Sequence, residues 1–166
     1  DAVEFDITEK VAKVISDLKL VAKDADVHIE FDRPGDCVYV NADIRRIERA
    51  LRNLITNAID HAEGKPIHVT LRANENAASI GVRDFGIGLD QESASRVFDR
   101  FWRADPSRSR LRGGTGLGLS LALEDAHLHH GNIEVFGKLG AGANFVLTIP
   151  KKVTNQVPQS LIPVKF

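Results

Sequence analysis

The stretch Ser79-Ile80-Gly81-Val82-Arg83-Asp84-Phe85-Gly86-Ile87-Gly88 joins two patterns of different kinds. Residues 79–83 alternate between polar and apolar positions, which is typical of a half-buried β-strand. The alternation stops at Asp84, and glycines follow at Gly86 and Gly88. A carboxylate at the end of a strand, beside backbone that a ligand can approach closely, is a candidate site for recognising a base. Because glycines after a strand usually form only a turn, this stretch by itself favours the turn.

A helix is predicted before this stretch, beginning after Asp43, a residue type favoured at the N-cap position. Asn53 and Asn57 lie one turn apart on its polar face, and Asp60 falls beside them. Asparagine is unfavourable within a helix because its amide competes with the backbone for hydrogen bonds. The pair is therefore a candidate site, although a solvated polar face is the alternative that it leaves open. The apolar face is formed by Ile44, Ile47, Leu51, Leu54, Ile55, Ala58 and Ala62.

Gly113–Gly118, which follows the central stretch, has four glycines in six residues and leads into another predicted helix. Backbone N–H groups at the start of a helix, together with the helix dipole, favour an anion. The segment therefore predicts a phosphate-binding loop. It lacks the Gly-Lys-[Ser/Thr] ending of a Walker A loop, and no continuous strand leads into it as in a Rossmann fingerprint.

The segment between the central stretch and this loop is rich in arginine. Five arginines lie from Arg100 to Arg112, while Phe98, Phe101 and Trp102 gather at its start. We interpret it as a mobile basic loop that is anchored by its aromatic end. The aromatic residues are not interleaved with the arginines, which argues against a site where nucleic-acid bases stack.

Shorter patterns account for the rest of the chain. At the start of the chain we predict a strand at 3–7 and an amphipathic helix over about 7–24, with a capping box at Asp6 and Glu9. A strand at 27–31 follows, and another returns at 37–40 after a Pro34-Gly35 turn. The later predicted elements are a hairpin of 67–71 and 78–82, a short helix at 90–97, and closing strands at 133–136 and 144–149. His129, like His127 and His130, falls at a helix end, where it would complement the dipole rather than bind a metal. We interpret 1–150 as one domain and 151–166 as a tail compatible with disorder, because the tail has two prolines and no period.

The composition fits a globular domain of ordinary size. The chain has 166 residues, of which 43% are hydrophobic and 27% charged, so it can bury a core and stay soluble. Its net charge of −1 does not indicate nucleic acid or an anionic membrane as a partner. Cys37 is the only cysteine, which excludes an internal disulfide, and no apolar run approaches the ~20 residues of a membrane span. Because the chain contains no methionine, we expect a fragment of a longer protein.

Taken together, residues 3–150 resemble the catalytic, ATP-binding domain of bacterial sensor histidine kinases, in the superfamily that includes Hsp90, MutL and gyrase. Four sequence boxes of that family follow one another in the right order, and a weaker third glycine box comes after them. These are Asn53–Asn57 (N box), Asp84–Gly88 (first glycine box), Phe98–Arg103 (F box), Gly113–Gly118 (second glycine box) and Gly140–Gly142 (third glycine box). Within the family, Trp102–Ser107 and Glu124–His129 resemble actinobacterial MtrB-type osmosensory kinases.

The resemblance implies an α+β fold. This is a two-layer α/β sandwich (Bergerat fold), in which a mixed, mostly antiparallel sheet carries about three helices on one face. The nucleotide would lie between the asparagine helix and the arginine-rich segment, which would act as a lid.

The resemblance also implies ATP and Mg²⁺ as ligands. Asp84 would accept a hydrogen bond from the adenine amino group, and Asn57 would hold Mg²⁺ with the triphosphate, assisted by Asn53. Arg100 or Arg103 would neutralise charge during phosphate transfer. Further nucleotide contacts would come from Gly86, Gly88, Gly114, Thr115, Gly116, Leu117 and Gly118.

Asn53 separates the branches of the superfamily. In the Hsp90 and MutL branches a glutamate at this position activates water, whereas an amide cannot act as a general base at neutral pH. The resemblance therefore implies transfer to a histidine on an upstream helical dimerisation and phosphoacceptor domain. The whole protein would be a membrane-bound homodimer that signals to a response regulator, with this domain in the cytoplasm. Alternatives are an ATP-hydrolysing switch of the Hsp90 or MutL type, a serine kinase acting on an anti-sigma-factor antagonist, and a nucleotide-sensing pseudokinase.

Two positions depart from the family pattern. Asp60-His61 stands where many members have Lys-Tyr, so we expect Asp60 to point away from the phosphates. Asn144 stands in the third glycine box where Thr or Ser is commoner. Neither change removes the adenine site or the metal site.

Overall fold

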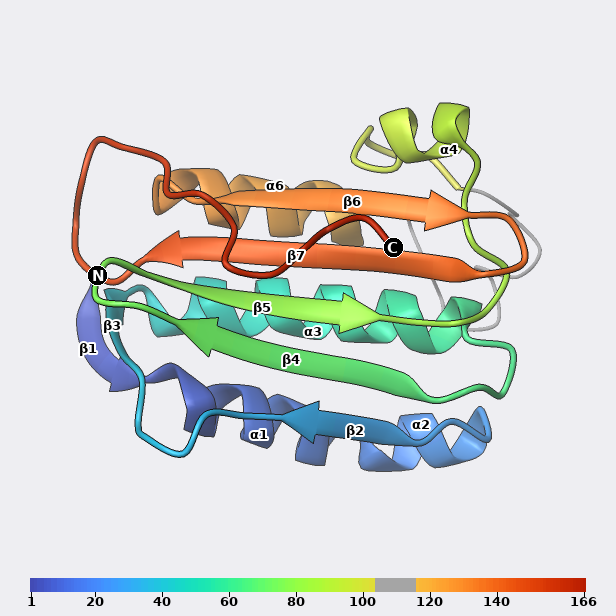
Figure 1. Cartoon of the computed structure of the whole chain (residues 1–166), viewed down its shortest axis with the longest axis horizontal. Helices are drawn as coiled ribbons and strands as arrows, with labels where there is room; N and C mark the ends of the chain where they lie inside the picture. Colours follow the sequence, from blue (N-terminus) through green and yellow to red (C-terminus); the bar gives the residue numbers. More distant parts are fainter. Residues whose placement is uncertain (104–115) are drawn as a thin grey trace.

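The computed structural model describes residues 1–103 and 116–166. Figure 1 shows a layer of strands in front of a layer of helices. In chain order the elements are β1 (Val3–Asp6), α1 (Ile7–Asp17), α2 (Lys19–Asp24), β2 (Ile29–Asp32), β3 (Tyr39–Ala42), α3 (Ile44–His61), β4 (Ile67–Ala73), β5 (Ala77–Arg83), α4 (Gln91–Arg96), α6 (Gly118–Leu128), β6 (Asn132–Lys138) and β7 (Gly142–Pro150). This arrangement confirms the predicted α+β sandwich.

Five strands form the main sheet in the order β2-β4-β5-β7-β6, and all neighbours are antiparallel except β2 and β4. The predicted hairpin is formed by β4 and β5, with Leu71 opposite Ile80. The predicted closing strands are β6 and β7, and β7 also pairs with β5 so that Asn144 lies opposite Arg83. This register places Asp84, the residue after β5, beside the turn that joins β6 to β7.

The helices α1, α3 and α6 cover one face of the sheet (Figure 1). α3 lies in the middle and contacts α1, α6, β5 and β7. Its Leu51, Leu54 and Ile55 are fully buried in the core, which fixes the helix on the sheet. Within residues 1–103 and 116–166, every helix is too short or too polar to cross a bilayer.

The second short strand, β3, pairs with β1 and does not return beside β2. Phe5 lies opposite Val40 in this two-stranded sheet. The carboxylate of Asp6 accepts hydrogen bonds from the backbone N–H groups of Thr8 and Val38, at 2.9 and 3.2 Å. One side chain therefore caps α1 and also holds β3 in place, a link that the alternation of residues 37–40 could not reveal.

The predicted helix over 7–24 is divided into α1 and α2 at Leu18, whose N–H still bonds to the carbonyl of Val14 at 3.1 Å. Leu18 stays buried, so the chain bends around a core side chain. Asp6 is the N-cap of α1, as predicted, but Glu9 forms an ion pair with Arg33 at 3.0 Å. Among the described residues, Asp6 therefore acts as a simple N-cap that binds the N–H of Thr8, and the reciprocal bonds of a capping box with Glu9 are not formed.

The C-terminal segment crosses the face of the sheet that the helices leave open (Figure 1). The N–H of Leu161 donates to Oγ of Ser79 at 3.0 Å, and the amide of Asn144 donates to the carbonyls of Pro163 and Val164 at 3.2 and 3.1 Å. β5 and β7 are consequently buried on both faces. The tail has no periodicity that predicts order, and it is held here by hydrogen bonds to distant strands.

Candidate functional site

Asp84 lies directly after β5 and is only 1% exposed. Its carboxylate accepts a hydrogen bond from the N–H of Gly86 at 3.0 Å, and its own N–H donates to the carbonyl of Ala143 at 3.0 Å. Burial raises the pKa of Asp84, and the bond from Gly86 and the proximity of His61 oppose this rise only in part. A carboxylate has about four acceptor positions, so Asp84 can accept further bonds from a ligand.

The first glycine box is bound to the C-terminal end of α3. A methyl group at Gly86 would overlap the carbonyl of His61, so glycine is required for this approach. The N–H of Ile87 donates to the same carbonyl at 3.2 Å. The ring of His61 is in turn bonded through Nδ1 to the carbonyl of Asn57 at 2.8 Å. The last turn of α3 therefore connects Asp84 with Asn57.

Gly88 has a similar role on the other side of the box. It has a φ of +78°, and a methyl group there would overlap the carbonyl of Lys138. The N–H of Gly140 donates to the carbonyl of Ile87 at 2.8 Å. The box is thus held between α3 and the β6–β7 turn. These backbone contacts explain Gly86 and Gly88 by packing, and their contact with a nucleotide stays a prediction.

Asn53 and Asn57 are half-buried on the polar face of α3. The start of α6 lies close to Asn53: a Cβ added at Gly118 would be 3.4 Å from Oδ1 of that residue. Leu117 occupies the N-cap position, and within the described chain no side chain caps this helix start. The amides of an uncapped first turn favour an anion. The structure therefore brings Asn53 and Gly118 together around a site suited to negative charge.

Gly116 connects this helix start to the F box. Its φ is +78°, its carbonyl accepts a hydrogen bond from the N–H of Phe101 at 2.8 Å, and a methyl group there would lie 2.6 Å from the Cα of Phe101. Phe98 packs its ring edge-on against Phe145 of β7, with centroids 6.1 Å apart. Phe98 and Trp102 therefore anchor this end of the arginine-rich segment on the core, as predicted, whereas Phe101, which was also expected to anchor it, is exposed.

The other predicted residues of this region are placed only in part. Arg100 is exposed, with its guanidinium 5.9 Å from the centroid of the Phe101 ring, and Arg103 is half-buried. Gly114 and Thr115 lie outside the described residues, and so do the arginines after residue 103. The roles of these residues in phosphate binding and transfer stay predictions.

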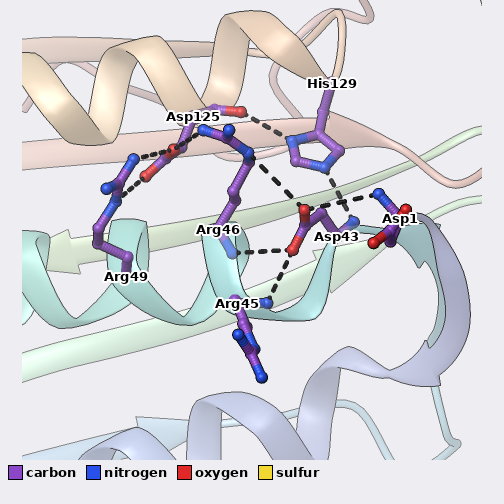
Figure 2. Close-up of polar contacts among 7 residues, drawn as sticks. All are labelled: Asp1, Asp43, Arg45, Arg46, Arg49, Asp125 and His129. Atoms are coloured by element: carbon purple, nitrogen blue, oxygen red, sulfur yellow. Dashed lines mark hydrogen bonds and ion pairs between the residues drawn. The ribbon is translucent and has the colours of Figure 1, made fainter.

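Asp125 of α6 is a second buried carboxylate, and the sequence did not single it out. It is fully buried and pairs with two arginines of α3 (Figure 2). Arg49 donates two hydrogen bonds to it at 2.8 and 2.6 Å, and Arg46 donates a third at 3.2 Å. The hydrogen bond to Asp125 raises the pKa of Arg49. Because a bidentate pair fixes geometry as well as charge, these residues determine how α6 lies along α3.

His129, the C-cap residue of α6, extends this group to the start of α3 (Figure 2). Its Nε2 accepts a hydrogen bond from the N–H of Asp43 at 3.0 Å, and its Nδ1 lies 2.7 Å from the carbonyl oxygen of Asp125. Since a backbone N–H can only donate, Nδ1 carries the ring hydrogen and donates to that carbonyl. His129 therefore lies at the helix end, as predicted, and also joins α6 to the N-cap residue of α3.

The signal for Asp125 was present in the sequence. Asp125 lies three residues after Ala122 and one before Ala126, and both alanines are fully buried. A carboxylate on the buried side of a helix needs a charged partner, so its position in the stripe could have prompted a search for one. The partners themselves, Arg46 and Arg49, lie far away in sequence and carry no comparable signal.

Known sequences resemble this chain over most of its length. Residues 42–153 match the family of histidine kinase-, DNA gyrase B- and HSP90-like ATPases. The chain is 45% identical over 160 residues to the sensor histidine kinase MtrB of Mycolicibacterium paratuberculosis. This match covers 96% of this chain and 28% of MtrB. It is 37% identical over 148 residues to the sensor-like histidine kinase SenX3 of Mycobacterium tuberculosis, covering 89% of this chain and 36% of SenX3. The chain thus spans well under half the length of these relatives.

Solved structures lead to the same family. The nucleotide-free catalytic domain of the histidine kinase ThkA superposes with a TM-score of 0.82 at 25% identity, over 94% of this chain and 99% of that domain. Full-length ShkA in complex with AMPPNP has the same fold, with a TM-score of 0.81 at 24% identity, over 93% of this chain and 32% of ShkA. The predicted resemblance to MtrB-type kinases is confirmed. This chain belongs to the histidine kinase-, DNA gyrase B- and HSP90-like ATPase family, and it is similar within that family to a sensor histidine kinase, MtrB, and to a sensor-like histidine kinase, SenX3.

Proposed function

We propose that the chain is the catalytic domain of a protein-histidine kinase, which binds Mg-ATP and transfers the γ-phosphate to a histidine on a separate domain. Membership of an ATPase family implies that it binds ATP. The observation that carries the proposal is the grouping of a buried carboxylate, Asp84, with Asn53, Asn57 and the start of α6 around one helix, α3.

Asp84 is suited to the amino group of adenine. An ionised carboxylate only accepts hydrogen bonds, and the adenine amino group donates them. The bond would form at a buried position, where a charged acceptor binds more strongly than it would in water. The N–H of Gly86 already orients the carboxylate, so little conformational freedom would be lost when the base binds.

The phosphates would lie between the asparagine face of α3 and the start of α6. The first amides of α6, with Gly114, Thr115 and Gly116 before them, would donate to phosphate oxygens. The half-buried amide oxygens of Asn57 and Asn53 fit Mg²⁺, which prefers oxygen ligands and retains several waters. When bound, the ion would neutralise phosphate charge. Arg100 or Arg103 would add positive charge near the transferred group.

Asn53 favours phosphate transfer over hydrolysis. An amide cannot take a proton from water at neutral pH, so a water molecule beside the γ-phosphate would lack a base at this position. The alternative function, an ATP-hydrolysing switch, needs such a base. The site would thus protect the γ-phosphate from water and position it for another nucleophile.

The acceptor would belong to another part of a longer protein. This chain covers 28% of MtrB and 36% of SenX3, which leaves room for further domains in such proteins. We place the acceptor histidine on an upstream helical dimerisation domain, with a response regulator as the next recipient. We also place this domain in the cytoplasm, in a membrane-bound homodimer, with no nucleic-acid partner.

Incubation with γ-labelled ATP tests the transfer. The chain is incubated alone and with the helical domain, then treated with acid, because phosphohistidine is acid-labile. We expect no label on the chain alone and acid-labile label on the added domain. Asn57→Ala should abolish this labelling yet retain adenosine binding, because the metal acts on the phosphates. Acid-stable label on the chain, or hydrolysis at about 1 s⁻¹ or faster, would contradict the proposal.

A further inference from the structure

The C-terminal segment 158–166 occupies a sheet face that is shaped to receive it. Ile162 covers Gly81, where an added Cβ would lie 3.5 Å from two of its carbons. Ser79 and Asn144 are buried, and their polar atoms bind the backbone of the segment. The segment therefore takes a definite path across β5 and β7, which brings its last residue, Phe166, to the end of β5.

Phe166 covers the side chain of Arg83. The guanidinium carbon of Arg83 lies 3.5 Å from the centroid of the Phe166 ring and 4.1 Å from that of Phe85. Phe166 also meets the ring of Phe136 on β6, edge-on at 5.0 Å. Burial lowers the pKa of Arg83, in keeping with a guanidinium that is partly withdrawn from water.

Arg83 joins the first glycine box, which begins at Asp84, to the third glycine box, Gly140–Gly142. One of its nitrogens donates both to the carbonyl of Asp84 and to the carbonyl of Ala141, the latter at 2.8 Å. Gly142 packs so closely that a methyl group there would overlap the Asp84 carbonyl. Hydrogen bonds of a charged donor are stronger when water is excluded, so the ring of Phe166 strengthens this junction.

We propose that segment 158–166 positions the carboxylate of Asp84 for base recognition, through the contact of Phe166 with Arg83. Phe166 and Arg83 are then positioning residues, because they act through the backbone of Asp84. The inference rests on the proposed adenine site. It predicts that loss of the Phe166 ring loosens the backbone at Asp84 and reduces the preference for adenine, while the phosphate contacts near α6 are unaffected.

The test compares the affinities of ATP and inosine triphosphate, in which an oxygen replaces the adenine amino group. Both are measured by calorimetry with Mg²⁺ on the whole chain. A cation–π contact of this kind predicts a loss of about 3- to 10-fold in the ATP-to-ITP affinity ratio for Phe166→Ala. Arg83→Lys, which keeps the charge but loses the planar guanidinium, should show the same loss. Phe166→Tyr should retain the ratio, and so should Val157→Ala, which alters an exposed residue of the tail.

The outcomes separate this inference from the function on which it rests. Wild-type chain that binds ATP no more tightly than ITP would overturn the adenine site and the inference together. Wild-type chain that prefers ATP, with an equal preference in Phe166→Ala, would overturn the inference alone. Equal losses of both nucleotides in Phe166→Ala would do the same, because they would show general destabilisation. A selective loss of ATP, rescued by Phe166→Tyr, would support it.

Discussion

Asp84 and Asp125 are both aspartates with almost no exposed surface, yet their surroundings are opposite. Asp125 receives three hydrogen bonds from two arginines. Within residues 1–103 and 116–166, the carboxylate of Asp84 receives one, from the backbone N–H of Gly86, and burial raises its pKa. The charge of Asp125 is thus balanced within the protein, whereas much of the bonding capacity of Asp84 is left for a ligand. A buried carboxylate therefore indicates a binding site chiefly when the protein itself does not neutralise it.

The largest effect is expected for the carboxylate that the protein neutralises. Asp125→Asn leaves Arg46 and Arg49 without their anion and should lower the free energy of unfolding by about 3 kcal/mol. This is the lower end of the range for a broken buried pair, because the arginine side chains are 43% and 44% exposed and can be rehydrated. Urea titration measures the loss.

Asp17→Asn is the matched control for this change. Asp17 also contacts two cations, Lys13 at 3.0 Å and Arg52 at 3.3 Å, but it lies at the surface. Its substitution should leave the free energy of unfolding nearly unchanged. Equal losses in the two variants would show that burial does not distinguish these pairs.

The next effect is on binding. Asp84→Asn should weaken ATP by about 10- to 100-fold, which corresponds to roughly 1.5–3 kcal/mol, because the amide loses a charge-assisted bond to the adenine amino group. The free energy of unfolding should change by less than about 1 kcal/mol, because a charge that is costly to bury is removed. Calorimetry and urea titration on the same protein separate the two quantities. Unchanged ATP affinity would remove Asp84 from the adenine site.

A smaller effect distinguishes the two arginines of Asp125. Arg49 makes two hydrogen bonds to the carboxylate and Arg46 makes one. Arg49→Gln should therefore lower the free energy of unfolding by about 1–2 kcal/mol, and Arg46→Gln by less than about 1 kcal/mol. The reverse order in urea titrations would show that bidentate geometry is not what stabilises the contact between α3 and α6.

The smallest effect concerns pH. The pKa of Asp84 is raised from 3.8 by burial, so between pH 3.8 and its folded value the folded state binds more protons than the unfolded state. The contribution of Asp84 to the free energy of unfolding therefore falls as pH rises through this window and is constant above it. Asp84→Asn lacks this contribution. Urea titrations of both proteins between about pH 4 and 7 should show a wild-type-minus-variant difference that falls with pH, and a rising difference would contradict the assignment.

The sequence predicted the elements whose pattern is local. The hairpin of β4 and β5 follows from alternation, and α3 follows from its apolar stripe and from Asp43 at its N-cap. The partner of β3 could not be predicted, because alternation shows that a strand exists but not what it pairs with. The path of the tail was missed for a related reason, since the bond from Leu161 to Ser79 joins residues 82 positions apart.

The residues of the candidate site likewise divide into those with a local signal in the sequence and those whose partners lie far away in it. Asp84, Asn53 and Asn57 could be found because their residue types are unusual at their positions in a strand end and a helix. Asp125 was missed, because a charged residue in a helix is normally taken for a solvated one, and its partner Arg49 lies 76 residues away. For Gly86 the sequence indicated close approach by a ligand, whereas the structure shows close approach by the backbone of α3.

The hydrogen bonds of His129 have a chemical consequence, because the relatives of this chain include histidine kinases. A ring nitrogen attacks phosphorus only through an unshared electron pair. In His129 the pair on Nε2 is directed at the N–H of Asp43, and Nδ1 carries the hydrogen that faces the carbonyl of Asp125. The imidazole thus has no nucleophilic nitrogen available while α6 rests on α3, so this histidine cannot compete as a phosphate acceptor although it belongs to the same domain as the nucleotide site.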